Sequence, residues 1–277
     1  MMKVAYTGWT WVKHGETDYV KADVEAAFRE CKYLGYDYVE NFAFLRDHYY
    51  ENPQELVDLQ KKYNVELVNL YGHFGFDEEA EIEKAKLQID FLAEVGGKWF
   101  NCQNSGFDSE GEPERPTSPE KIDAMCRIAN ALGEYAKAKG VTLCFHPHYG
   151  TVVFWQSDID YFAENTNPKF VSFCVDTAHS TLAGIDPVKL IKQLGKRVEY
   201  IHFKDVDTYA MGNLEGWGKM GSFRALGLGT VNFPACKAAL EELDYDGVIC
   251  VELDNPAVSN YNSAEISRKY IRNALGL

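Results

Sequence analysis

Short apolar runs alternate with amphipathic segments along the whole chain. The runs are nearly continuous in apolar residues, as expected of parallel strands that are covered on both faces. They predict strands at 3–8, 37–41, 65–71, 98–103, 141–146, 170–176, 198–203 and 247–253. Eight strand–helix units without a doubled edge favour closure of the sheet. We therefore predict an α/β fold, a (β/α)₈ TIM barrel formed by a single domain over residues 1–277.

The segments between the predicted strands carry helical periodicity and recognisable ends. Apolar residues at helical spacing precede Gly35, which predicts a first helix that ends at this glycine. Ser118-Pro119 and Asp186-Pro187 each offer an N-cap followed by a first-turn proline. The first strand is followed by TGWTWVKHGE rather than a glycine-rich phosphate loop, which removes the main support for a dinucleotide-binding fold.

Composition narrows the functional class. The net charge of −14 opposes broad contact with a phosphate backbone, so we expect no nucleic-acid partner. No run approaches eighteen apolar residues and the chain enters a strand at once, so we expect no membrane contact and a cytoplasmic location. The seven cysteines lack CxxC spacing, and four lie in strand runs, which predicts buried free thiols.

Metal-capable side chains stand where four successive strands end. His146, Asp176, His202 and Glu252 terminate the fifth to eighth predicted strands, whose carboxyl ends meet at the mouth of a barrel. Imidazoles combined with carboxylates suit Mn²⁺, Co²⁺, Zn²⁺ or Fe²⁺ better than Mg²⁺ or Ca²⁺. Taken singly, each residue also fits a structural role, such as a cap, a core histidine or a pairing of Glu252 with Lys204. Their joint placement favours a metal site.

Two long loops follow strands on the same face of the predicted barrel. Residues 103–117 follow the fourth strand, and residues 207–230, which include Trp217 and Arg224, follow the seventh. Long loops at this face commonly form lids or substrate walls.

Four motifs carry a resemblance to a known family. DTAH at 176–179, HFKD at 202–205, LGLGTVNFP at 226–234 and GVICVELDNP at 247–256 resemble the xylose-isomerase-like barrel superfamily of sugar isomerases, epimerases and cyclitol dehydratases. The resemblance implies that Asp176, His202 and Glu252 hold a divalent metal with His146 at the strand-five position. We expect Mn²⁺ or Co²⁺ first, with Zn²⁺ and Fe²⁺ as alternatives.

The strand-five residue departs from the common pattern of this family. Ketose isomerases and epimerases of the family carry a glutamate there, whereas HPHYGT at 146–151 resembles the histidine-rich strand five of inosose dehydratases. YGHF at 71–74 points the same way. We therefore predict an enzyme that eliminates water from a keto-cyclitol or keto-sugar through a metal-stabilised enolate. A ketose isomerase or epimerase is the alternative.

Several further residues are candidates for catalysis or substrate binding. We assign catalytic roles to His146, His148, His179 and Glu252. His148 could ligate the metal, orient a ligand or act as a base, and the resemblance places His179 on a substrate oxygen. Candidates for contact with a small polyol substrate are Trp9, Glu40, His73, His179, Lys204, Asp205 and Arg224, although ion pairing or barrel filling would also explain them.

Two other functional classes are less well supported. The apurinic-endonuclease branch shares the DTxH pattern but needs three metals and histidines after strand seven, and residues 206–230 contain none. A non-catalytic ligand-binding barrel would bind no metal. Whether the chain forms a homo-oligomer stays open.

Overall fold

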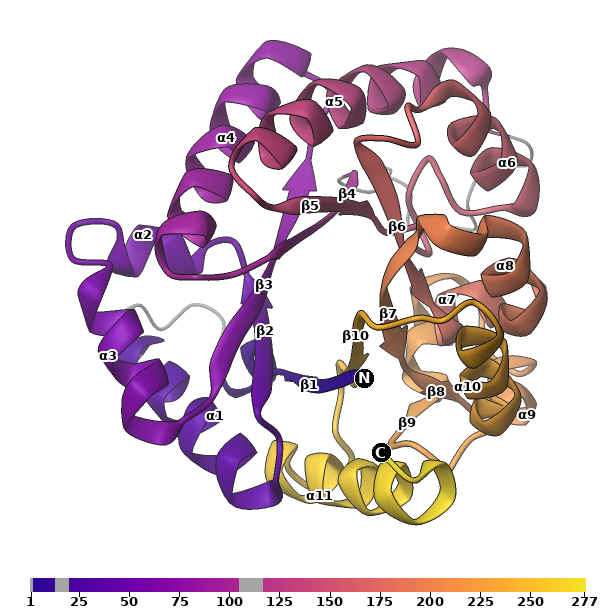
Figure 1. Ribbon diagram of the computed structural model, residues 1–277. Coiled ribbons are helices and arrows are strands. Elements are labelled where there is room, and N and C mark those ends of the chain that lie inside the picture. Colours follow the sequence, from indigo (N-terminus) through magenta and orange to yellow (C-terminus); the bar gives the residue numbers. More distant parts are fainter. Residues whose placement is uncertain (1, 13–19, 105–116) are drawn as a thin grey trace.

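Eight parallel strands close into a barrel in the order β1-β10-β7-β6-β5-β4-β3-β2, which confirms the predicted fold class (Figure 1). The computed structural model describes residues 2–12, 20–104 and 117–277. The barrel strands are β1 (Lys3–Thr7), β2 (Tyr38–Phe42), β3 (Glu66–Phe74), β4 (Trp99–Asn104), β5 (Thr142–Phe145), β6 (Val171–Asp176), β7 (Val198–Phe203) and β10 (Val248–Val251). Each matches a predicted apolar run.

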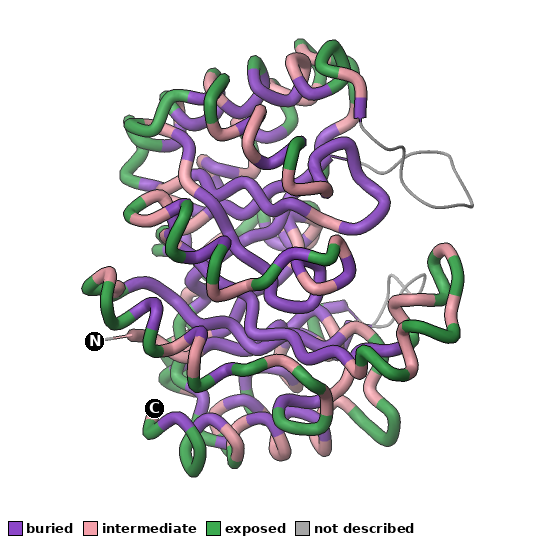
Figure 2. The backbone as a smooth tube through the Cα atoms, turned by 90° about the vertical axis from the view of Figure 1, so that its right-hand side faces the viewer, coloured by how far each residue is buried: buried purple, intermediate pink, exposed green. Residues whose placement is uncertain are grey.

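Helices surround the barrel and cover its outer face (Figure 1). They are α1 (Val20–Leu34), α2 (Leu45–Tyr49), α3 (Gln54–Tyr63), α4 (Glu78–Glu94), α5 (Pro119–Ala138), α6 (Gln156–Asn165), α7 (Thr177–Leu182), α8 (Pro187–Leu194), α9 (Thr208–Met211), α10 (Phe233–Glu242) and α11 (Asn260–Tyr270). Short 3₁₀ turns cover Gly8–Trp11, Gly195–Arg197 and Gly216–Ser222, and a π turn covers Ile271–Leu275. Figure 2 shows the buried backbone in the centre and the exposed backbone at the periphery.

The helix ends mostly follow the local signals in the sequence. Gly35 has φ +87°, the left-handed conformation that ends α1. The side chain of Asp186 accepts a hydrogen bond from the N–H of Val188 at the start of α8. Pro119 opens α5, but the Ser118 side chain makes no cap hydrogen bond. All seven cysteines are free and buried, as predicted.

The segment after β7 contains a small antiparallel pair that the apolar pattern does not predict. β8 (Asp205–Val206) pairs with β9 (Phe223–Arg224). The Asp205 carboxylate accepts hydrogen bonds from the backbone N–H groups of Val206, Gly227, Gly229 and Val231, at 2.8 to 3.1 Å. This one side chain therefore fixes the course of the returning loop.

Most of the loop at 103–117, which we predicted to form a lid or substrate wall, lies outside the described residues, because this loop is described only at its two ends.

Among the helices of the described ranges, none is both long and apolar enough to cross a bilayer.

Candidate metal centre and active site

Four buried side chains converge at the carboxyl ends of β5, β6, β7 and β10. Nε2 of His146 lies 3.0 Å from Nδ1 of His202 and 3.6 Å from Oδ2 of Asp176. Nδ1 of His202 lies 2.8 Å from Oε2 of Glu252 and 3.8 Å from Oδ2 of Asp176. One ligand atom from each residue lies within 4.8 Å of the other three. We call His146, Asp176, His202 and Glu252 the metal cage.

The register of the barrel explains why residues so distant in sequence meet. His202 on β7 pairs with Asp176 on β6 and with Cys250 on β10, so these side chains lie at one level of the barrel. Glu252 lies two residues beyond Cys250 and therefore points to the same face. The N–H of Glu252 donates to the carbonyl of Phe203 at 3.1 Å, which continues the ladder past the end of β10.

The donor set of the cage fits a divalent cation. Oδ1 of Asp176 accepts from the N–H groups of Ala178 and His179, at 2.7 and 2.8 Å. Oδ2 of Asp176 is buried and makes no hydrogen bond with any residue of the described ranges, and the buried Oε2 of Glu252 faces Nδ1 of His202 at 2.8 Å. A buried carboxylate oxygen without a hydrogen-bond partner, such as Oδ2 of Asp176, is costly, and both oxygens face the imidazole nitrogens of the cage. A cation held between them would satisfy all four ligand atoms.

The electrostatics of the cage also favour positive charge. Burial alone would lower the pKa of His202, but Cys174, Glu40 and Glu252 raise it well above its usual range. Burial raises the pKa of Asp176 to about 7, although Lys204 acts in the opposite direction. Burial and His202 lower the pKa of His146 well below its usual range, so this ring stays neutral with a lone pair to offer.

Both imidazoles of the cage are held from behind by a polar group. Nε2 of His202 lies 3.0 Å from Oε2 of Glu40, and Nδ1 of His146 lies 3.0 Å from the hydroxyl oxygen of Tyr71. Asn69 and Asn101 donate side-chain hydrogen bonds to the same Glu40 oxygen. Such partners fix the orientation of a metal-binding histidine and raise its basicity.

Glu40 consequently lies somewhere other than the sequence suggests. We expected it to contact a polyol substrate, but it is fully buried against His202, and its carboxylate is engaged by side chains of the barrel interior. The reason is its place within β2 rather than at the end of that strand.

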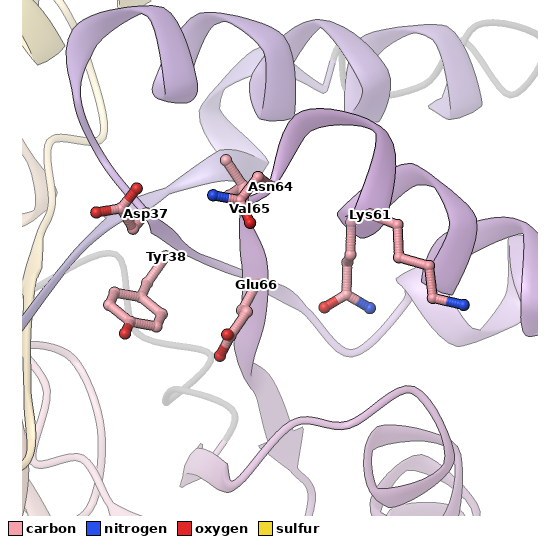
Figure 3. Close-up of a pocket in the computed structure, with 7 residues that line it drawn as sticks. Asp37, Tyr38, Lys61, Asn64, Val65 and Glu66 are labelled. Atoms are coloured by element: carbon pink, nitrogen blue, oxygen red, sulfur yellow. The ribbon is translucent and has the colours of Figure 1, made fainter.

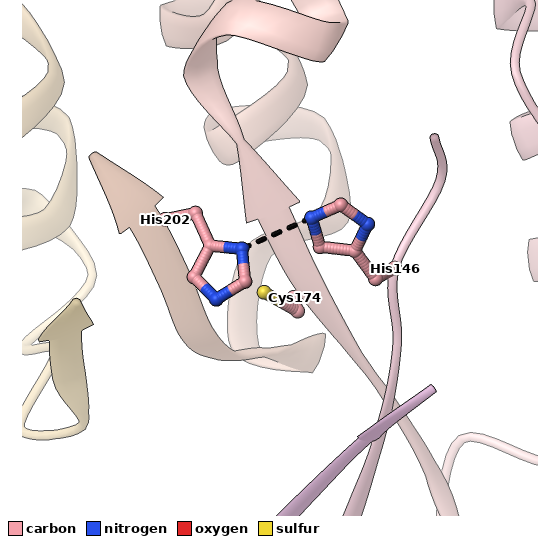
Figure 4. A group of neighbouring side chains, drawn as sticks. All are labelled: His146, Cys174 and His202. Carbon is pink, nitrogen blue, oxygen red and sulfur yellow. Dashed lines mark hydrogen bonds between the residues drawn. The ribbon is translucent and has the colours of Figure 1, made fainter. Parts of the chain in front are cut away.

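A thiol lies close to the two histidines of the cage. His146, Cys174 and His202 offer ligand atoms within 4.8 Å of one another (Figure 4). Burial raises the pKa of Cys174 to about 12, so the thiol keeps its proton near neutral pH. Since the thiolate is the metal-binding form, the carboxylate of Asp176 two residues further along β6 is the stronger candidate ligand.

The second histidine of the HPH motif has a defined tautomer. Nδ1 of His148 lies 2.7 Å from the carbonyl oxygen of Tyr149, which can only accept, so Nδ1 carries the proton. Nε2 of His148 is therefore the atom with the free lone pair. The ring lies against that of His179, with 3.7 Å between ring centroids and an angle of 40° between the ring planes. Burial lowers the pKa of both rings well below 6.5.

Lys204 is a fully buried cation beside the cage. Its Nζ lies 2.8 Å from Oδ2 of Asp254, 3.4 Å from Oε1 of Glu252 and 3.4 Å from Nε2 of His179. The ring of Phe223 lies 4.5 Å from the same nitrogen. Burial alone would lower the pKa of Lys204, but Asp254 and Glu252 raise it, so the amine stays charged.

Two predicted substrate residues form an aromatic wall with neighbouring rings. Trp9 stacks on Phe42 with 4.6 Å between centroids, and Phe42 lies 5.5 Å from the rings of both Tyr71 and His73. Tyr71 in turn lies 5.2 Å from His146. The wall, which we define as Trp9, Phe42, Tyr71 and His73, therefore reaches the metal cage.

Two other predicted substrate residues are engaged elsewhere. The carboxylate of Asp205 is buried and bound by four backbone N–H groups, so it shapes the loop instead of facing a ligand. Arg224 donates to the carbonyls of Gly221 and Phe223 and lies 3.5 Å from the carboxylate of Asp207. Both side chains therefore form hydrogen bonds with backbone groups of residues 206–231.

Several contributors to the site escape the reasoning from sequence, among them Tyr71, Asn101 and Asp254. Tyr71 and Asn101 lie within β3 and β4 and point into the barrel, so alternation along these strands could have found them, whereas Asp254 lies beyond the end of β10. A tyrosine inside an apolar run is interpreted as a core residue, so the sequence gives no sign that its hydroxyl contacts a residue of the site.

A cavity of about 410 Å³ lies at the end of the barrel opposite the metal cage, where β2 and β3 begin (Figure 3). It is lined by Asp37, Tyr38, Gln60, Lys61, Asn64, Val65 and Glu66. The amino-terminal face of such barrels generally serves stability, and none of the histidines of the site reaches this cavity.

Comparisons with known proteins agree with this architecture. Residues 28–274 match the family model described as Xylose isomerase-like TIM barrel. An inosose dehydratase from Geobacillus thermodenitrificans is 31% identical over 218 residues, covering 73% of this chain and 72% of the relative. Another, from Bacillus velezensis, is 32% identical over 214 residues, covering 71% of each protein.

Solved structures share the fold at lower identity. D-allulose 3-epimerase from Methylomonas sp. in complex with D-allulose has a TM-score of 0.75 at 21% identity and covers 98% of this chain and 96% of that one. The IolI protein with a bound zinc atom has a TM-score of 0.75 at 17% identity, over 99% and 98% of the two chains. The match of the family model and the dehydratase relatives confirm the resemblance read from the motifs. The chain belongs to the xylose isomerase-like TIM barrel family.

Proposed function

We propose that this protein is a divalent-metal-dependent lyase that removes water from a keto-cyclitol of the inosose type. The observation that carries the proposal is that the two histidines of the HPH motif differ in their environment: His146 belongs to the metal cage, whereas the ring of His148, with its centroid 5.5 Å from that of His146, has an unprotonated Nε2. Relatives at about 30% identity that are named inosose dehydratases support the same reaction class.

The cage residues His146, Asp176, His202 and Glu252 would hold the cation, for which Mn²⁺ or Co²⁺ is our first choice and Zn²⁺ or Fe²⁺ the alternative. When bound there, the metal supplies Lewis acidity, which polarises a ketone oxygen and makes the neighbouring C–H bond more acidic. Glu40 and Tyr71 keep both imidazoles turned toward the cage, so the cation site is formed before substrate arrives.

His148 is the base of the proposed reaction. Its Nε2 takes the proton from the carbon next to the ketone, because Nδ1 is already occupied by its hydrogen bond to Tyr149. Burial keeps the ring neutral at physiological pH, so the base is ready without prior deprotonation. The electron pair of the broken C–H bond forms a carbon–carbon double bond as the C–O bond of the β-hydroxyl breaks.

The departing hydroxyl needs a proton and a positive environment. His179 and Lys204 lie 3.4 Å apart on the side of the cage that Phe223 covers. The charged amine of Lys204 stabilises negative charge on the leaving oxygen and donates the proton that converts it to water; the proton that His148 took from carbon is given up after the product leaves, and Lys204 is reprotonated, so that no net proton is consumed. Asp254 and Glu252 hold Lys204 in place.

The aromatic wall would receive the apolar C–H face of the cyclitol ring. Its rings run from Trp9 to Tyr71, next to His146, so a ring that reaches the cation also contacts the wall. Aromatic surfaces provide large contact area at low cost in side-chain entropy.

An assay of inosose with the Mn²⁺- or Co²⁺-loaded protein tests the proposal. Dehydration produces an enone absorption in the ultraviolet and a product lighter by one water, whereas epimerisation changes neither mass nor absorbance. A product of unchanged mass, formed from inosose or from a ketose such as D-allulose, would replace the lyase by an isomerase or epimerase. A protein that binds no added Mn²⁺ or Co²⁺ would instead favour a non-catalytic barrel.

A further inference from the structure

A glutamine at the end of β4 has an unsatisfied side chain at the barrel mouth. Gln103 is 8% exposed, and its Oε1 is buried without a hydrogen-bond partner in the described part of the chain. Leaving a buried acceptor unsatisfied costs about 1 to 3 kcal/mol. A cost of this kind at the mouth of a barrel suggests a group that a ligand satisfies.

The register of β4 shows where this side chain points. Asn101, two residues earlier on the same strand, donates to Glu40 inside the barrel, so Gln103 also faces inward. Gln103 pairs with His73 of the aromatic wall on the β3 side. On the other side, the N–H of His146 donates to the carbonyl of Cys102, so the ladder continues and places Gln103 level with the cage histidine.

The chemistry of the orphan atom identifies the ligand group. An amide oxygen accepts hydrogen bonds only, so its partner must be a donor. Ionised phosphates and carboxylates only accept, whereas a hydroxyl donates to Oε1 and can accept from the neighbouring Nε2. We infer that the side-chain amide of Gln103 is a specificity-determining contact that binds a ring hydroxyl of the substrate on the β3–β4 side of the mouth. The inference rests on the proposed function and adds which group of the substrate the protein recognises at this position.

The test replaces the amide without changing the volume. Gln103→Met keeps the length of the side chain and removes the acceptor. The matched control is Gln88→Met on α4, because Oε1 of Gln88 is also buried without a partner but belongs to a helix outside the barrel. Both variants remove an unsatisfied acceptor, so both should have unfolding midpoints at or above that of the wild type.

We expect Gln103→Met to raise the KM for inosose about five- to tenfold with little change in kcat, as for loss of one neutral hydrogen bond. Consider a set of inosose analogues that each lack one hydroxyl. For the wild type, one of these analogues should have a KM about five- to tenfold above that of inosose. For Gln103→Met, the same analogue should have the same KM as inosose, because the hydrogen bond is already lost. Gln88→Met should match the wild type throughout.

Three results would overturn the inference while leaving the lyase proposal intact. They are an unchanged KM in Gln103→Met, equal losses with every deoxy analogue, and a drop in unfolding midpoint that Gln88→Met does not share. If the wild type turns over neither inosose nor D-allulose, the proposed function fails separately. Gln103 is then judged by equilibrium binding of these two polyols to Mn²⁺-loaded protein, where equal affinities of wild type and Gln103→Met would refute it.

Discussion

Oε2 of Glu40 lies 3.0 Å from Nε2 of His202, on the edge of the imidazole opposite the metal cage. The carboxylate thus fixes which nitrogen of His202 is offered to a cation. Glu40→Gln should weaken the affinity for Mn²⁺ about 10- to 100-fold while the protein stays folded. Titration calorimetry with Mn²⁺ measures this, with Glu66→Gln at the exposed start of β3 as control. Equal affinities of wild type and Glu40→Gln would show that the pair does not orient the ring.

Asp176→Asn separates the charge of the cage from the shape of the fold. The amide oxygen can still accept from the N–H groups of Ala178 and His179, so α7 should keep its start. Without the charge of Oδ2, we expect loss of bound metal and of lyase activity. Elemental analysis and circular dichroism together check this. A folded variant with full metal content and full activity would remove Asp176 from the cage.

His148→Asn should lower kcat about 10²- to 10⁴-fold, the usual contribution of a positioned base, while the metal content stays that of the wild type. The surviving metal separates this variant from those of the cage. His48→Asn on α2 is the matched control and should keep full activity. Loss of metal in His148→Asn would instead make His148 a ligand.

Two neutral histidines, the buried His179 and the half-buried His148, predict a pH dependence of stability. Burial lowers the pKa of His148 and His179 well below 6.5, so below pH 6.5 the unfolded chain binds more protons than the folded one. The contribution of each ring to stability is therefore lost as pH falls below about 6.5, by up to about 1.4 kcal/mol per pH unit.

Urea unfolding of metal-free wild type and His148→Gln between pH 8 and pH 5 checks this sign, because the difference between the two curves isolates one ring. The wild type should lose more stability on acidification than the variant. Parallel curves would mean that the fold does not favour the neutral form of His148.

Gly229→Ala should destabilise the protein by about 1 to 3 kcal/mol, since a Cβ there would lie 2.3 Å from Oδ1 of Asp205 and 2.6 Å from the carbonyl of Val206. Gly218→Ala is the control, because a Cβ at that position meets nothing within 4 Å. Thermal unfolding measures both. Equal midpoints would show that the loop yields without cost.

The apolar runs predicted every strand of the barrel, because a strand covered on both faces must be apolar along its length. The cage could be predicted for a related reason: parallel strands share one carboxyl edge, so polar residues at four ends must meet. The pairing of Lys204 with Asp254 could not be predicted, because Asp254 lies beyond the end of β10, where strand register no longer fixes the direction in which a side chain points. The role of Asp205 could not be predicted either, because the sequence does not distinguish a carboxylate that faces a ligand from one that accepts hydrogen bonds from backbone amides.

The Asp205 loop has a consequence for redesign. Four backbone amides of the segment after β7 converge on one carboxylate at the end of the strand, so the segment is folded around a local anchor rather than around the metal cage. Phe223, which covers Lys204, belongs to this segment. A loop of different length could be grafted between Asp205 and Val231 with the anchoring glycines retained. Such a graft would change the residues that cover Lys204 and would leave the four cage ligands in place.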